Sequence, residues 1–201
     1  MKKLLCFLIV AFFSSCTGVY FNSPQPGDGK KFNSVPAELQ GKWIENSDTC
    51  IVNSSGMYQT ESKKDSAGNV ISVKRKWTNL SDSILLFSLD KYYVINILGD
   101  DGKGYQVVVI DIQSNGDINW YYPLNAPFFG SRKGLEVVKV NRTVKGKRKT
   151  DKSLKAVKGE QIDEVYYSGK LNTDDLKKVM LPVNLIWVLK KDGTAVSPQN
   201  K

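Results

Sequence analysis

The sequence predicts an all-β domain with one short helix near its C-terminus, folded as an antiparallel meander barrel or a sandwich. Short runs rich in Val, Ile, Tyr and Trp recur along the chain, and Gly-, Asn- and Asp-rich connections separate many of them. The clearest run is Val70–Trp77, in which Ile71, Val73 and Trp77 alternate with polar residues. This period of two is typical of a strand with one apolar face.

The expected strands follow one another from Gly41 onward. They are Lys42–Asn46, Thr49–Asn53, Met57–Glu61, Val70–Trp77, Ile84–Leu89, Tyr92–Leu98, Tyr105–Ile112, Ile118–Tyr122, Leu135–Asn141, Glu164–Ser168 and Val183–Lys190. Short connections such as Asp65–Asn69 and Ser114–Asp117 have the turn chemistry that joins antiparallel neighbours.

One helix of about two turns is expected before the last strand. Asn172 or Thr173 can cap its start, and Pro182 ends it. Leu176, Val179 and Met180 fall on one face. The strand that follows is apolar on both faces, which predicts a central position or a cover from the helix.

The N-terminus has the pattern of a secretory signal. Two lysines precede an unbroken apolar run at positions 4–13, which is too short to span a bilayer stably. Phe13-Ser14-Ser15-Cys16 then resembles a bacterial lipobox, although Phe13 stands where Leu is usual. The resemblance implies a lipoprotein signal over residues 1–15 and lipidation of Cys16. An ordinary signal peptide with a fortuitous cysteine, or an uncleaved anchor, are the alternatives.

The remainder of the chain divides into a tether and a domain. Residues 16–36 hold scattered Pro and Gly among polar residues, which predicts a flexible tether after the lipidated cysteine. Residues 37–201 are expected to form a single all-β domain. Thr17 follows Cys16 where an Asp would signal inner-membrane retention, so the resemblance implies an outer-membrane lipoprotein. The aromatic, Asn- and Lys-rich composition is similar to lipoproteins of the Bacteroidetes.

A second resemblance lies at the first expected strand. Leu39-Gln40-Gly41-Lys42-Trp43 resembles the Leu-x-Gly-x-Trp opening of lipocalin-like barrels. In that family Gly permits a tight entry to the strand and Trp closes the barrel floor. A core aromatic following a turn, in another meander barrel or sandwich, is the alternative reading of Trp43.

The residue types that are present restrict the catalytic and metal-binding chemistry open to this chain. The chain has no histidine, which excludes Ser-His and Cys-His catalysis and His-based zinc sites. After loss of the signal and lipidation of Cys16, Cys50 is the one remaining thiol and is expected to be buried. We expect no cofactor and no metal. Carboxylate pairs such as Asp163-Glu164 and Asp174-Asp175 leave a carboxylate-based hydrolase as a distant alternative.

Positive charge is concentrated in one segment. Between Arg132 and Lys158 there are eleven basic and two acidic residues, within a chain of net charge +9. This segment is either a solvated loop or a contact with an anionic envelope component. The candidate contact residues are Arg142, Lys145, Lys147, Arg148 and Lys149. Charge alone would also suit nucleic acid, but an envelope location argues against it.

An aromatic–proline cluster precedes the basic segment. Tyr121, Tyr122, Phe128 and Phe129 flank two prolines and form either a pocket lip or a corner of the core. Together these features predict an envelope lipoprotein whose domain binds a small apolar ligand without catalysis. The alternative is a structural or interaction module that contacts an anionic component through the basic loop. The sequence indicates no oligomeric state.

Overall fold

A computed structural model of the chain describes residues 17–45, 48–99, 102–123, 129–130, 133–155, 158 and 160–192, and almost all of its regular structure is strand. The elements, in chain order, are β1 (Gly18–Phe21), β2 (Lys30–Phe32), the 3-10 helix η2 (Ala37–Leu39), β3 (Gly41–Glu45), β4 (Asp48–Val52), β5 (Gly56–Lys64), β6 (Val70–Asn79), β7 (Ile84–Leu89), β8 (Tyr92–Leu98), β9 (Tyr105–Ile112), β10 (Ile118–Tyr121), β11 (Leu135–Val144), β12 (Lys147–Asp151), β13 (Glu160–Gly169), α2 (Thr173–Val179), the 3-10 helix η4 (Pro182–Asn184) and β14 (Leu185–Lys191). The predicted all-β class is confirmed.

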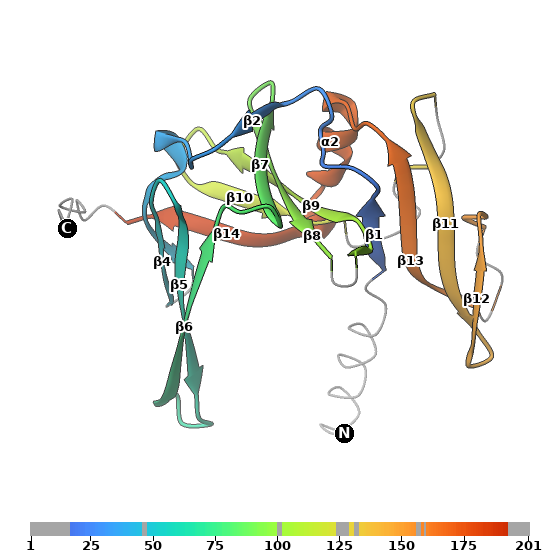
Figure 1. Cartoon of the computed structure of the whole chain (residues 1–201). Coiled ribbons are helices and arrows are strands. Elements are labelled where there is room, and N and C mark those ends of the chain that lie inside the picture. Colours follow the sequence, from blue (N-terminus) through green and yellow to red (C-terminus); the bar gives the residue numbers. More distant parts are fainter. Residues whose placement is uncertain are drawn as a thin grey trace.

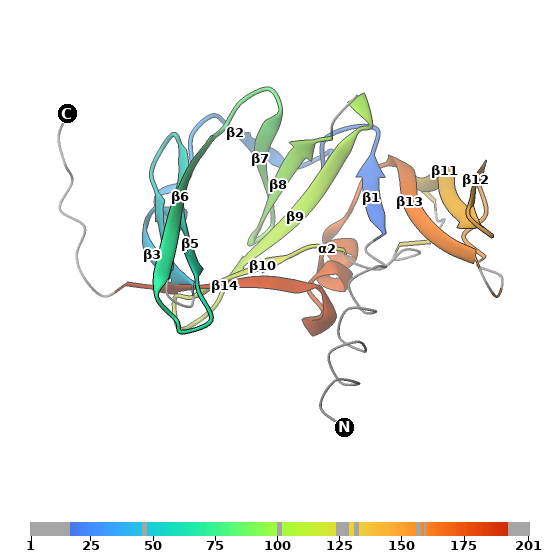
Figure 2. The ribbon, with the colours of Figure 1, turned by 90° about the horizontal axis from the view of Figure 1, so that it is seen from below.

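Two antiparallel meanders form the larger part of the sheet. β3 to β6 pair in chain order, and so do β7 to β10. β14 lies between β10 and β3 and joins the two meanders, so it is central as its sequence predicts. Figures 1 and 2 show the strands curving around a common interior.

The curved sheet is not a closed barrel. Among the described strands, β6 pairs only with β5, and β7 pairs with β8 and the short β2. The two meanders therefore meet at β14 and stay open between β6 and β7. Closure depends on strand number, tilt and register acting together, and no local pattern encodes these.

A smaller group of strands, the outer wing, consists of β1, β13, β11 and β12 and is joined to β9 through β1. β1 pairs in parallel with β13 and meets β9 at Phe21 and Tyr105. β13 then pairs with β11, and β11 with β12, which is the last strand of this wing (Figure 1). The wing adds the strands β1 and β12, neither of which the sequence patterns predict.

The flexible tether predicted over residues 16–36 is wrong for its described part, which is folded into the domain. Val19 and Phe21 have no exposed surface, and neither has Gln25. The backbone N–H of Gln25 donates to Asn96 Oδ1, while Asn96 Nδ2 donates to the carbonyl of Gln25, both at 2.6 Å. Val19 and Phe21 pack in one hydrophobic cluster with Val94, Val165 and Tyr167, which all lie more than seventy residues away in the sequence.

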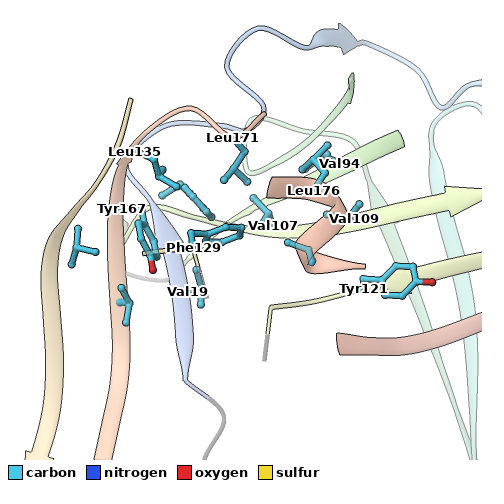
Figure 3. Packing of buried hydrophobic residues seen from close by; sticks show 14 of the residues in the cluster. Val19, Val94, Val107, Val109, Tyr121, Phe129, Leu135, Tyr167, Leu171 and Leu176 are labelled. Atoms are coloured by element: carbon cyan, nitrogen blue, oxygen red, sulfur yellow. The ribbon is translucent and has the colours of Figure 1, made fainter. Parts of the chain in front are cut away.

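Two hydrophobic clusters lie on opposite faces of the sheet, and β9 contributes to both. Val107 and Val109 pack in the first cluster with β1, β13 and α2 (Figure 3). Val108 and Ile110 pack in the second cluster, which faces the curved interior. Because successive strand side chains point to opposite faces, this run of valines and isoleucine is buried on both sides.

The helix is α2, as predicted, and it begins with a capping box. Asn172 Oδ1 accepts from the backbone N–H of Asp175 at 3.0 Å, and Asp175 Oδ2 accepts from the backbone N–H of Asn172 at 2.9 Å. Leu176 and Val179 are fully buried against the sheet. The helix ends at Val179, before the predicted end at Pro182, and Pro182 starts η4. The strand expected from Val183 therefore begins at Leu185.

Candidate functional site: an apolar cavity and a basic hairpin

The curved interior holds an apolar cavity of about 690 Å³. Eight strands contribute to its wall. Of these, β7, β8, β9 and β10 contribute alternate residues, because every second side chain of a strand points to the same face. Its aliphatic lining includes Ile84 and Leu86 of β7, Ile95 of β8, Val108 and Ile110 of β9, and Ile118 of β10. A cavity of this size and composition is suited to a small apolar molecule.

Three tryptophans line the same cavity. The rings of Trp120 and Trp187 lie 5.4 Å apart with an interplanar angle of 60°. Trp77 is 42% exposed and packs against its cross-strand partner Tyr58, with ring centroids 5.9 Å apart. These rings give the cavity a broad apolar surface whose geometry is fixed by the strands.

Polar residues of the lining gather on β5 and β6. Gln59 is half-buried, whereas Lys76 and Asn79 are exposed and also line the cavity. Lys76 and Asn79 therefore lie where the cavity meets solvent. The arrangement combines an apolar interior with a positive charge at the opening.

The segment that resembles the lipocalin opening lies next to the cavity. η2 leads into β3 through Gly41, whose φ of +142° favours glycine. Trp43 is 1% exposed, and its Nε1 donates to the carbonyl of Leu39 at 3.2 Å. Leu39 itself lines the cavity. Trp43 is thus a core aromatic next to the interior.

The predicted pocket lip is divided between the two faces of the sheet. Tyr122 lines the cavity, and its hydroxyl accepts from Gln106 Nε2 at 2.9 Å. Tyr121 and Phe129 instead pack in the first cluster, so their assignment to a pocket lip is wrong (Figure 3). Tyr121 is the last residue of β10, and Tyr122 follows it directly, so the two side chains lie on opposite faces as successive residues of an extended chain do. Phe128 lies outside the described residues.

The predicted basic loop is a hairpin. β11 and β12 are joined at Lys145 and Gly146, which have φ of 47° and 75°, as in the tight turns that link antiparallel strands. Lys145, Lys147, Arg148 and Lys149 are all exposed. Residues 147–151 lack apolar alternation, which explains why the sequence indicates a loop where the structure has an edge strand.

Arg142 is the exception among the predicted contact residues, because it is 2% exposed. Its Nη1 donates to Glu160 Oε2 and to the carbonyl of Lys155, both at 2.9 Å, and its Nη2 donates to Asp151 Oδ1 at 2.8 Å. The prediction that Arg142 contacts an anionic surface is therefore wrong. Its guanidinium instead holds together the strands and the connection of the outer wing.

A carboxylate cluster lies on β13, beside a second and more open depression of about 640 Å³. Glu164 accepts from Asn141 at 2.6 Å, from Arg148 at 2.8 Å, from Tyr166 at 3.1 Å and from Lys103 at 3.2 Å. Burial alone would raise the pKa of Glu164, but the bonds from Asn141, Lys103 and Tyr166 lower it below its ordinary value. Burial, followed by the Glu164 charge, raises the pKa of Tyr166 to about 12.

The carboxylates considered for hydrolysis have structural contacts. Glu164 has the four donors above, Asp163 accepts from Thr143 Oγ1 at 2.8 Å, and Asp175 belongs to the capping box of α2. The described residues include no group of His, Cys, Asp and Glu side chains arranged to hold a metal ion. Cys50 is buried, as predicted, at 3% exposure. Cys16 lies outside the described residues.

Comparison with protein-family models, with curated protein sequences and with solved structures finds no match for this chain. Within its described part, every helix is too short or too polar to cross a bilayer.

Proposed function

We propose that this chain is a lipid-anchored envelope protein whose domain binds a small, largely apolar ligand without catalysis. The observation that carries the proposal is the apolar cavity of about 690 Å³. Ligand pockets of about 300–1,000 Å³ with mostly apolar walls and a few polar groups hold small molecules in other proteins. The signal pattern that ends at Cys16 supports the anchor.

The lining indicates the character of the ligand. Aliphatic and indole side chains would contact its body. The aliphatic side chains provide no donors or acceptors, and each indole provides only its Nε1–H as a donor. Lys76 at the opening would favour an acidic or polar end group that stays near solvent. The proposed ligand is therefore an amphiphile with one polar end.

A filled cavity tests the proposal. Ile95 lines the cavity on β8 and is half-buried, so Ile95→Trp would occupy ligand space while leaving most of the core intact. Ile44→Trp on β3 is the matched control, because Ile44 is 36% exposed and lies outside the cavity lining. Binding of N-phenyl-1-naphthylamine is measured by fluorescence titration, and circular dichroism checks the fold.

We expect Ile95→Trp to weaken probe binding by at least about tenfold, a change of about 1.4 kcal/mol, and Ile44→Trp to leave it unchanged. Equal probe affinity in the two variants and the wild type would contradict a ligand site in the cavity.

A second candidate function is contact with an anionic envelope component through the β11–β12 hairpin. The specific observation in its favour is that Lys145, Lys147, Arg148 and Lys149 are exposed together on one hairpin. Each basic residue near an anionic surface contributes about 1 kcal/mol at low salt.

A further inference from the structure

The β5–β6 hairpin extends beyond the body of the domain. Figure 1 shows its distal part projecting below the curved sheet, and Figure 2 views the domain from that lower side. The two strands pair from Gly56 and Asn79 outward to Lys64 and Val70. The cavity wall begins at Lys76, so the distal part of this hairpin does not serve the cavity.

The end of this hairpin exposes aliphatic side chains. Val70 is 53% exposed, Ile71 is 57% exposed and Val73 is 50% exposed. A register shift opposite Lys63 and Lys64 leaves Ile71 as an extra residue in the strand. A bulge of this kind redirects a side chain and ends regular pairing. Three adjoining aliphatic residues exposed on a projecting hairpin indicate a contact surface.

The charge of the same hairpin indicates the kind of partner. Residues 61–76 include five basic and two acidic residues, and the basic positions lie in both strands. Aliphatic residues beside lysine and arginine suit an anionic lipid surface, which offers phosphates at its face and acyl chains below.

Two other features of the domain lie on the same lower side in Figure 1. β1 runs upward from Gly18, so the start of this strand is at its lower end. β11 runs downward, so the exposed Lys145 and Lys147 at its turn also lie below. Figure 2 shows β1 between the two hairpins. The lower side thus combines the start of β1, a basic turn and an aliphatic tip.

We propose that the tip of the β5–β6 hairpin, at Val70, Ile71 and Val73, inserts into the surface of an anionic phospholipid bilayer and holds this lower side against it. This inference goes beyond ligand binding in the cavity and does not depend on it. The inserted tip holds the domain in one orientation on the bilayer. The open edge between β6 and β7 therefore faces a fixed direction relative to the bilayer.

Hydrogen exchange of the full chain tests the insertion directly. Exchange of the amides in residues 65–73 is measured by mass spectrometry with and without vesicles of phosphatidylcholine and phosphatidylglycerol. The test variant is Val70→Ser with Ile71→Ser. The matched control is Leu181→Ser with Val183→Ser, because these two residues are exposed to a similar extent, 49% and 57%.

We expect the vesicles to slow exchange at residues 65–73 by at least about tenfold in the wild type and in the control. The double serine variant should show less than about threefold slowing. Probe binding in the cavity should be unchanged in both variants, which separates this test from that of the ligand site.

Three results would overturn the proposal. One is exchange that vesicles leave unchanged in the wild type, and another is equal slowing in the wild type and in the double serine variant. The third is slowing that rises with protein concentration without vesicles, because this would show a second copy pairing with the edge of β6.

Discussion

Arg142 Nη1 donates to Glu160 Oε2 at 2.9 Å, in a position where the arginine has almost no exposed surface. The same guanidinium binds Asp151 and backbone carbonyls of the connection between β12 and β13. Arg148, six residues along the chain, pairs with Glu164 at 2.8 Å but leaves 65% of its side chain exposed. Arg142 and Arg148 thus both pair with carboxylates in the outer wing, and the two arginines differ chiefly in burial.

The difference in burial predicts different costs of substitution. Arg142→Ala leaves the carboxylate of Glu160 and two backbone carbonyls without this donor, so we expect a loss of about 2–4 kcal/mol in the free energy of unfolding. Arg148→Ala should cost less than about 1 kcal/mol, because solvent screens an exposed pair. Urea denaturation of both variants measures the difference, and equal losses would contradict a structural role for Arg142.

The lowered pKa of Glu164 predicts that the stability of the folded state depends on pH in the acidic range. The hydrogen bonds at this carboxylate lower its pKa in the folded state. Its contribution is therefore present above the unfolded pKa of about 4.3 and is lost as pH falls through the lower folded value. We expect Glu164→Gln to be less stable than the wild type at pH 7 and to approach it near pH 3. A stability difference that stays constant over this range would contradict the assignment.

The β11–β12 hairpin predicts salt-dependent binding to anionic vesicles or lipopolysaccharide. Replacing Lys145, Lys147, Arg148 and Lys149 by Gln should weaken binding, and wild-type affinity should fall steeply with salt, since screening acts within about 10 Å at 0.1 M. The matched control replaces four other exposed lysines, namely Lys30, Lys31, Lys177 and Lys178. Equal weakening in the two quadruple variants would show that total charge, and not this hairpin, is responsible.

The lipobox-like pattern that ends at Cys16 predicts that a lipid is covalently attached to this residue. Cys16→Ala should abolish acyl labelling in the native host and release the protein from the membrane fraction, because the acyl chains would be attached to this residue. Intact-mass analysis of the wild type should give a chain that begins at Cys16 and carries lipid. A mature chain cut at another position and without lipid would refute the lipoprotein assignment.

Much of the strand content was predictable because period-two alternation is a local property. The expected bounds agree with the structure at Ile84–Leu89, Tyr92–Leu98 and Tyr105–Ile112. The helix was predictable for a similar reason, since Asn172, Asp175 and Pro182 act within a few residues. The cavity was expected only as one of two possibilities, because alternation shows that a strand has an inner face and does not show whether that face encloses space.

The sequence by itself determined most of the strands, the helix and the signal pattern, because each depends on side chains within one short segment. The tertiary structure alone decided that Val19 and Phe21 are core residues, since β1 gains its partner from β13 some 145 residues later. It also decided that Arg142 points inward while Arg148 stays exposed, because strand register assigns each side chain to one face. Pairing between such distant strands depends on the favourable energy of the whole sheet and on the entropy lost when long loops close. Neither quantity can be deduced from one short segment of the sequence.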